Sequence, residues 1–309
     1  MKRFTRLIII AAAAAFLLTS CKIKDVIDPG PTAGVSPSPA VTATPDPAET
    51  FWNVPVFDTL DESELETYLL VLLAENPGNY GLHYTNLTTG SEIGIRDSEP
   101  YIAAESIALP VNLSLYKMLE DGLTSMAGQL EVTQADKIGT TGDVSNAEIG
   151  IKFTLEELSA ASLKQNDMTA LAMLIRYITP DYINEFITSI GAKNTNVPGY
   201  TSPGDMAVFL ETLYKSEENN PGIYSALSVN LLADQPILSA PLPQELNTIS
   251  KIGMYGSLPS YNDSMTVYGD TPYVLSIYTE NVLKTEAVNI MESASRAIYS
   301  FLNYGKLPL

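Results

Sequence analysis

The chain has 309 residues and a formal net charge of −19 at pH 7. A surface this acidic repels phosphate backbones and anionic lipid headgroups, so we expect no nucleic-acid binding. The single cysteine excludes intramolecular disulfides, four-cysteine zinc sites and Cys-x-x-Cys redox chemistry.

The N-terminus has the pattern of a secretion signal. Lys2, Arg3 and Arg6 form a charged start, and the apolar run over residues 8–18 is short for a membrane span. Leu-Thr-Ser then leads directly into Cys21, which resembles the lipobox of bacterial lipoproteins, whose cysteine is lipidated after cleavage. The alternative is an ordinary signal peptide with a chance cysteine.

Three segments are therefore predicted. Residues 1–20 are a lipoprotein signal peptide, and residues 21–57 are the lipidated Cys21 with a tether rich in Pro, Ser and Thr that has no apolar periodicity. Residues 58–309 are the folded domain. We expect the lipid on Cys21 to anchor the exported chain to the bacterial cell membrane, facing outward.

The folded part begins with a predicted helix and a predicted hairpin. Helical spacing relates four leucines, and Pro77-Gly78 ends the helix. The leucines are Leu65, Leu69, Leu72 and Leu73. Alternation then predicts two strands around a turn at residues 88–90, with apolar positions Tyr80, Leu82, Tyr84, Ile93 and Ile95.

The stretch AAESIALP at residues 103–110 precedes a predicted buried helix that ends at Gly122. Pro110 is tolerated only near a helix start. Residues 105–109 should therefore form the first turn, where backbone N–H groups have no partner within the helix.

A helical block follows, and then a group of strands. Helices are predicted from a capping box at residues 154–157, over 166–178, from Thr179-Pro180 to 190, and from Ser202. Residues 247–253, 263–269 and 271–279 read as strands, and residues 285–305 as an amphipathic helix.

This order predicts one α+β domain. Its antiparallel sheet is built from both chain ends and is flanked by the N- and C-terminal helices, and an all-helical lobe is inserted at about residues 105–235.

Over residues 60–303 the chain resembles the class A branch of the serine β-lactamase and penicillin-binding family. The resemblance rests on residues 80–119, 139–175, 201–214 and 249–253. It implies a β-lactamase/transpeptidase-like fold.

The family's Ser-x-x-Lys motif supplies a nucleophile and its base at the start of a buried helix. Aligning the flanking Ala-Ala and Leu-Pro places Glu105 at the serine position and Ala108 at the lysine position. A one-residue shift would make Ser106 the nucleophile but would put Leu109 at the lysine position of the motif. The only histidine, His83, lies on a predicted strand and is expected to be structural.

The other family motifs are also altered. The Ser-x-Asn motif falls on Asn166, Asp167 and Met168, and the Lys-Thr-Gly motif falls on Lys251, Ile252 and Gly253. Residues 191–200, where a deacylating glutamate would lie, contain no carboxylate side chain. We expect Glu105 to ionise at the helix start and to pair with Lys251.

The resemblance and these departures predict a catalytically inactive surface lipoprotein that binds a cell-wall peptide, a glycan or an envelope protein, with no metal or cofactor. One alternative is an active penicillin-interactive hydrolase or transpeptidase that uses Ser106 or another serine. Another is glycan hydrolysis with Glu105 and Asp167 as acid and base.

Overall fold

The computed structural model describes residues 60–197, 199–231 and 236–308. The predicted signal peptide, Cys21 and the predicted tether lie outside these residues. Among the helices that are described, none combines the length and the hydropathy needed to cross a bilayer.

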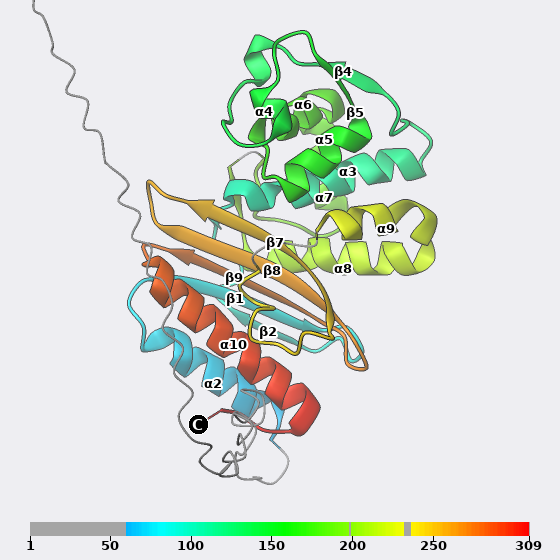
Figure 1. The fold of residues 1–309 in the computed structure, drawn as a ribbon. Helices are drawn as coiled ribbons and strands as arrows, with labels where there is room; N and C mark the ends of the chain where they lie inside the picture. The colour runs from blue at the N-terminus through cyan, green and yellow to red at the C-terminus, as the bar shows by residue number, and fades with distance from the viewer. Residues whose placement is uncertain (1–59, 198, 232–235, 309) are drawn as a thin grey trace, which may run out of the picture. The chain divides into compact units, whose positions relative to one another are not determined.

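A five-stranded antiparallel sheet is built from both ends of the described chain, as predicted (Figure 1). Its order is β2-β1-β9-β8-β7. The strands are β1 (Asn79–Asn86), β2 (Glu92–Ile95), β7 (Asn247–Tyr255), β8 (Ser260–Tyr268) and β9 (Tyr273–Glu280). The central pairing of β1 with β9 therefore joins the N-terminal hairpin to the C-terminal strands.

Helices α2 (Glu62–Ala74) and α10 (Lys284–Tyr304) cover one face of the sheet (Figure 1). A capping box of Asp61 with Glu64 starts α2. The predicted apolar face of α2 packs into one core with the alternate residues of the hairpin. These buried residues are Leu65, Leu69, Leu73, Tyr80, Leu82, Tyr84, Ile93 and Ile95.

The inserted lobe is mainly helical, but it is not all-helical as predicted, because residues 129–131 and 152–154 pair as two short strands within it. It contains η1 (Ala104–Ile107), α3 (Ala108–Glu120), η2 (Gln134–Asp136), α4 (Asp143–Asn146), α5 (Leu155–Lys164), α6 (Met168–Ile178), α7 (Pro180–Ser189), α8 (Pro203–Asn219) and α9 (Pro221–Asn230). Thr154 caps α5 through the predicted box, and a proline occupies the first turn of α7 and of α8. The prediction missed α9 and the short strands β3 (Tyr101–Ile102), β4 (Gln129–Glu131), β5 (Lys152–Thr154) and β6 (Tyr200–Thr201).

The second face of the sheet packs against α8 and carries a polar row. The row crosses the strands through the cross-strand partners Lys251, Ser264, Ser276 and His83. All four are buried, and the two serine hydroxyls are 2.8 Å apart. This face therefore joins sheet and lobe through polar as well as apolar contacts.

Strand β7 passes very close to the start of the lobe at Gly253. A Cβ atom added there would lie 2.5 Å from the Ala103 carbonyl oxygen and 3.1 Å from the Ser106 nitrogen. Since both are backbone atoms, no side-chain movement could relieve the clash. Glycine is thus required for this approach.

We expect Gly253→Ala to destabilise the fold by about 1–3 kcal/mol, because the strand and η1 would have to separate. Gly256→Ala is the matched control, since a Cβ there would meet nothing within 4 Å. Urea unfolding of both variants measures the difference. Equal stability of the two would contradict this account of Gly253.

Candidate functional site

Glu105 lies in η1, where the lobe begins. The residue before it, Ala104, has a φ of 49°, a left-handed conformation that concentrates at functional sites in non-glycine residues. The half-buried Glu105 side chain accepts a hydrogen bond through Oε2 from the backbone N–H of Met254, at 2.8 Å. This hydrogen bond thus joins the Glu105 carboxylate, at the start of the lobe, to the residue that follows Gly253 in β7.

A cavity of about 420 Å³ opens beside Glu105. It falls within the usual size range of small-ligand pockets. Its lining is Ile102, Ala104, Glu105, Met168, Gly199, Tyr200, Met254 and Tyr255. One carboxylate therefore stands among apolar and tyrosine side chains, and none of the lining residues is a serine or a lysine.

Lys251 is 3 % exposed and faces the lobe. Its Nζ donates to the Leu163 carbonyl oxygen at 3.2 Å and to Oδ1 of Asn166. Burial lowers the pKa of Lys251 to about 8, against the opposing effect of the Glu105 and Asp263 charges.

The predicted ion pair between Glu105 and Lys251 is wrong. Among the described residues, no Lys251–carboxylate contact lies within ion-pair distance, and Lys251 bonds a carbonyl and an amide oxygen instead. The Glu105 carboxylate accepts a hydrogen bond from the backbone N–H of Met254. Glu105 therefore acts on Lys251 only at longer range, by raising its pKa.

Asp167 is fully buried and works as a structural anchor. Oδ1 accepts from the backbone N–H groups of Thr169 and Ala170 at the start of α6, and from the Ser145 hydroxyl. Oδ2 accepts from the backbone N–H groups of Val144 and Ser145. With both oxygens occupied and no solvent access, this carboxylate lacks the exposure that acid–base catalysis on a glycan requires.

Ser106 is also fully buried. Its hydroxyl donates to the Ala103 carbonyl oxygen at 2.6 Å and lies 2.6 Å from the Tyr278 hydroxyl. The side chain thus faces the interior and has no contact with solvent.

Of the remaining motif positions, one lines the cavity and two are buried in the fold. Met168 lines the cavity, and Ala108 begins α3 with 1 % exposure. Ile252 is buried in β7. The structure thus brings Glu105 and Met168 together at the cavity, while Lys251 and Asn166 pair beside it.

Sequence reasoning missed Met254, Tyr200 and Tyr255. Met254 directly follows the altered Lys-Ile-Gly motif, so its position was a usable signal. Tyr200 reaches the cavity through the unpredicted pairing of β6 with β3. The loop before β6 is anchored by Asp205, which accepts from the backbone N–H groups of residues 193 and 194.

Comparisons with known proteins agree with this architecture. The model of the Beta-lactamase enzyme family matches residues 64–302. The β-lactamase OXY-2 of Klebsiella oxytoca is 26 % identical over 223 residues, which are 65 % of this chain and 76 % of that protein.

Two solved structures show the same fold. The β-lactamase from Sphaerobacter thermophilus DSM 20745 has a TM-score of 0.69 at 19 % identity, covering 78 % of this chain and 97 % of that one. The structure of PBP-A has a TM-score of 0.71 at 19 % identity, covering 78 % and 96 % of the two chains.

The buried Lys251 should give the stability a specific pH dependence. Its pKa falls from 10.5 in the unfolded chain to about 8 in the fold, so between these values the unfolded chain binds more protons. Stability should therefore rise with pH across this window, by roughly 2–3 kcal/mol relative to Lys251→Met. Urea unfolding of both proteins near the two ends of the window measures the difference, and parallel pH profiles would refute the effect.

Proposed function

From its membership of the Beta-lactamase enzyme family, we propose that the chain is a non-catalytic member whose cleft binds a cell-envelope ligand. The observation that carries this proposal is the hydrogen bond from the Met254 N–H to the Glu105 carboxylate. It puts a negative charge where the family resemblance implies a nucleophilic serine.

Acyl transfer needs a nucleophile with an adjacent base, and backbone N–H donors free to bind the oxyanion. Glu105 has no hydroxyl, and Ala108 has no group that could accept a proton. The Met254 N–H already has a carboxylate partner that would also repel an oxyanion. Each requirement is therefore unmet at this position.

The alternative nucleophile, Ser106, is supported less well. Its hydroxyl is fully buried and bonded within the fold, and the residue at its lysine position is the buried Leu109. A substrate could reach Ser106 only if η1 moved away from β7.

Binding is favoured by the character of the cavity. Tyr200, Met254 and Tyr255 are 50 %, 41 % and 44 % exposed, so three large hydrophobic side chains gather at one opening. Exposed apolar groups that gather with one carboxylate are typical of ligand sites. A wall peptide fits this set best, because its amine would pair with Glu105 and its aliphatic parts would contact the tyrosine rings.

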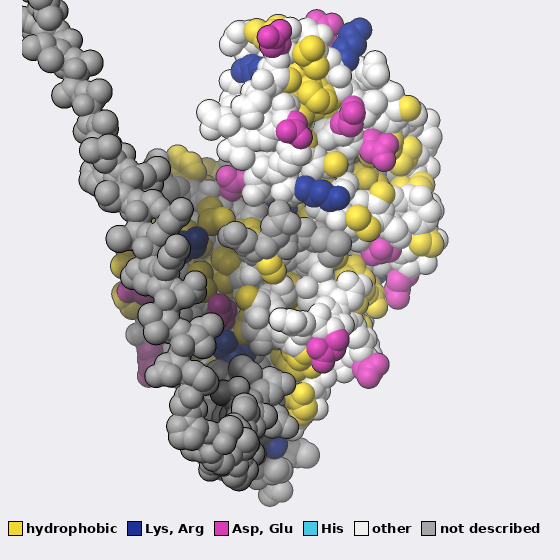
Figure 2. Space-filling model, viewed as in Figure 1, with side chains coloured by type: hydrophobic (Ala, Val, Ile, Leu, Met, Phe, Trp, Pro, Cys, Tyr) yellow, Lys and Arg dark blue, Asp and Glu magenta, His cyan; other side chains and the backbone are white. Residues whose placement is uncertain are grey.

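We further propose that the chain acts outside the bacterial cell, held at the membrane by a lipid on Cys21. The basis is the charged start, the apolar run and the Leu-Thr-Ser-Cys sequence at the N-terminus. On the face shown in Figure 2, the described basic side chains do not gather into a patch, so attachment through anionic headgroups has no evident surface there.

Incubation with a fluorescent penicillin tests the absence of acyl transfer. We expect no covalent adduct on the wild type by intact mass, and an adduct on the double variant Glu105→Ser/Ala108→Lys, which restores the nucleophile and the base. Glu105→Ser alone is the matched control without a base. An adduct on the wild type would overturn the proposal.

Muropeptides released from purified peptidoglycan test the binding. We expect saturable binding by calorimetry, weakened about tenfold by Tyr200→Ala because a central aromatic contact contributes roughly 1–2 kcal/mol. Leu123→Ala is the control, since Leu123 is exposed and does not line the cavity. Absence of binding, or equal losses in both variants, would refute a wall peptide as the ligand.

A further inference from the structure

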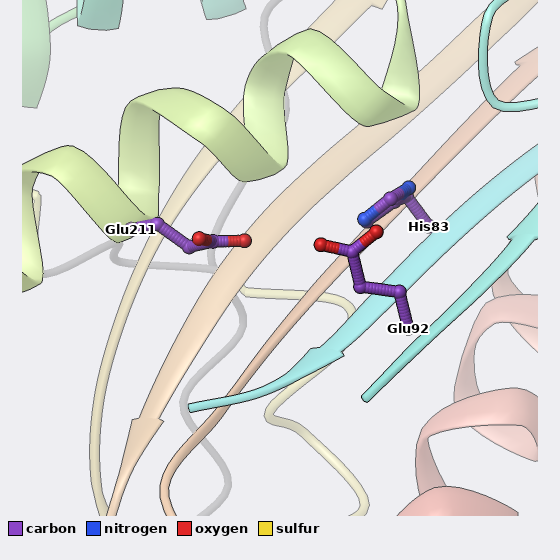
Figure 3. A group of neighbouring side chains, drawn as sticks. All are labelled: His83, Glu92 and Glu211. Atoms are coloured by element: carbon purple, nitrogen blue, oxygen red, sulfur yellow. The ribbon is translucent and has the colours of Figure 1, made fainter. Parts of the chain in front are cut away.

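A second group of functional side chains lies away from the cavity. His83 of β1, Glu92 of β2 and Glu211 of α8 each offer a ligand atom, and these atoms all lie within 4.8 Å of one another. Figure 3 shows a histidine ring nitrogen and both carboxylates directed toward one common space. The cluster therefore joins the N-terminal hairpin to the lobe.

Strand register explains the hairpin half of the cluster. Thr85 lies opposite Glu92, and His83 lies opposite Gly94. Because side chains two residues apart share one face of a strand, His83, Thr85 and Glu92 all face the same side. That side is opposite to the Tyr80 and Leu82 face and packs against α8, which brings Glu211.

Asp97 fixes the orientation of the histidine ring. Its Oδ2 lies 2.8 Å from Nδ1 of His83, while Nε2 lies 3.2 Å from the Thr85 hydroxyl. With the ring proton on Nδ1 in the bond to Asp97, the Nε2 lone pair is left to accept from the Thr85 hydroxyl or to bind a metal ion. Metal-binding histidines are typically held by a carboxylate in this way.

The slot for Asp97 is made by two glycines. A Cβ on Gly94 would lie 2.5 Å from the Asp97 Oδ2 atom, and one on Gly204 would lie 3.2 Å from the Asp97 carbonyl oxygen. The Gly204 N–H also donates to that carbonyl oxygen at 2.9 Å. The contact that orients His83 is thus built from both the sheet and the start of α8.

The negative charges of Glu92 and Glu211 are poorly neutralised by neighbouring cations. Among the described residues, Glu211 forms an ion pair with Lys215 alone, at 3.3 Å, and the Lys215 side chain is 66 % exposed, so this pair is weak. The Glu92 side chain makes no hydrogen bond or ion pair with the residues that the structure describes. Two carboxylates facing one space with so little positive charge form an attractive site for a cation.

We infer that His83, Glu92 and Glu211 bind a divalent transition-metal ion of the Zn²⁺ type. One imidazole and two carboxylates are ligands that Zn²⁺ accepts, whereas an all-oxygen set would suit Mg²⁺ or Ca²⁺. Water would complete the coordination on the exposed side of Glu92. Sequence analysis predicted no metal and a purely structural histidine, whereas the geometry of the cluster indicates a metal site with His83 as a ligand.

Such an ion would link β1 and β2 to α8. Since it would bind only where all three elements meet, it would stabilise the folded chain in proportion to its affinity and concentration. The helix it holds directly follows β6, which carries Tyr200 of the cavity. The inference does not depend on what the cavity binds.

The test uses the full chain without a histidine tag, freed of metal with a chelator and titrated with ZnCl₂ by calorimetry. We expect one Zn²⁺ per chain. Because His83 is the only histidine, the imidazole ¹⁵N signals belong to it alone. The Nε2 signal should shift on metal addition, while the Nδ1 proton stays bound to Asp97.

Three variants should weaken binding, and one should not. We expect His83→Gln, Glu211→Gln and Asp97→Asn each to lower the affinity at least about tenfold; Asp97 is a positioning residue that acts through His83. Glu218→Gln is the matched control, because it removes the same charge two turns further along α8. Thermal unfolding of each metal-free variant checks that it folds.

Several outcomes would overturn the inference. They are no Zn²⁺ binding, an unmoved His83 signal, an equal loss of affinity in Glu218→Gln, and binding of several ions with no loss in any variant. The last would indicate diffuse attraction to the acidic surface. If His83→Gln failed to fold, Glu211→Gln and the His83 signal of the wild type would still decide the matter.

Discussion

The site depends on the backbone contact between β7 and η1 at Gly253. This contact brings the Met254 N–H within hydrogen-bond distance of Glu105 and places Lys251 against the lobe. Lys251 and Gly253 face the lobe together because side chains two residues apart on a strand share one face, and the Met254 N–H is available because β7 is an edge strand. A bulkier residue at 253 would separate the charged groups of the lobe from those of the sheet, so one missing side chain determines the geometry of the whole cleft.

Lys251 is buried among neutral polar groups in the interface between the sheet and the lobe. Among the described residues, the ammonium bonds to neutral oxygen atoms alone, and burial outweighs the nearby carboxylates in setting its pKa. The polar row that starts at Lys251 continues through Ser264 and Ser276 to His83. The face between sheet and lobe is therefore held by hydrogen bonds and close packing, and no described ion pair crosses it at Lys251.

Local patterns predicted most of the fold, because they encode interactions between near neighbours. The alternation of Tyr80, Leu82 and Tyr84 and the capping box at Thr154 both hold in the structure. The partners of Glu105 and His83 depend on elements distant in sequence. A backbone N–H such as that of Met254 has no sequence signature, and Glu211 meets His83 only because α8 crosses the sheet. Sequence analysis therefore singled out Glu105 and Met168, which line the cavity, but it assigned Glu105 the wrong partner.

The Glu105–Met254 hydrogen bond also bears on how this chain could change over generations. A serine at 105 alone would lose that bond and, beside Ala108, would gain no base. A lysine at 108 alone would place a charge at a position that is now 1 % exposed. Under the proposed non-catalytic function, a nucleophile and a base would therefore be restored only if both positions changed, which couples residues 105 and 108.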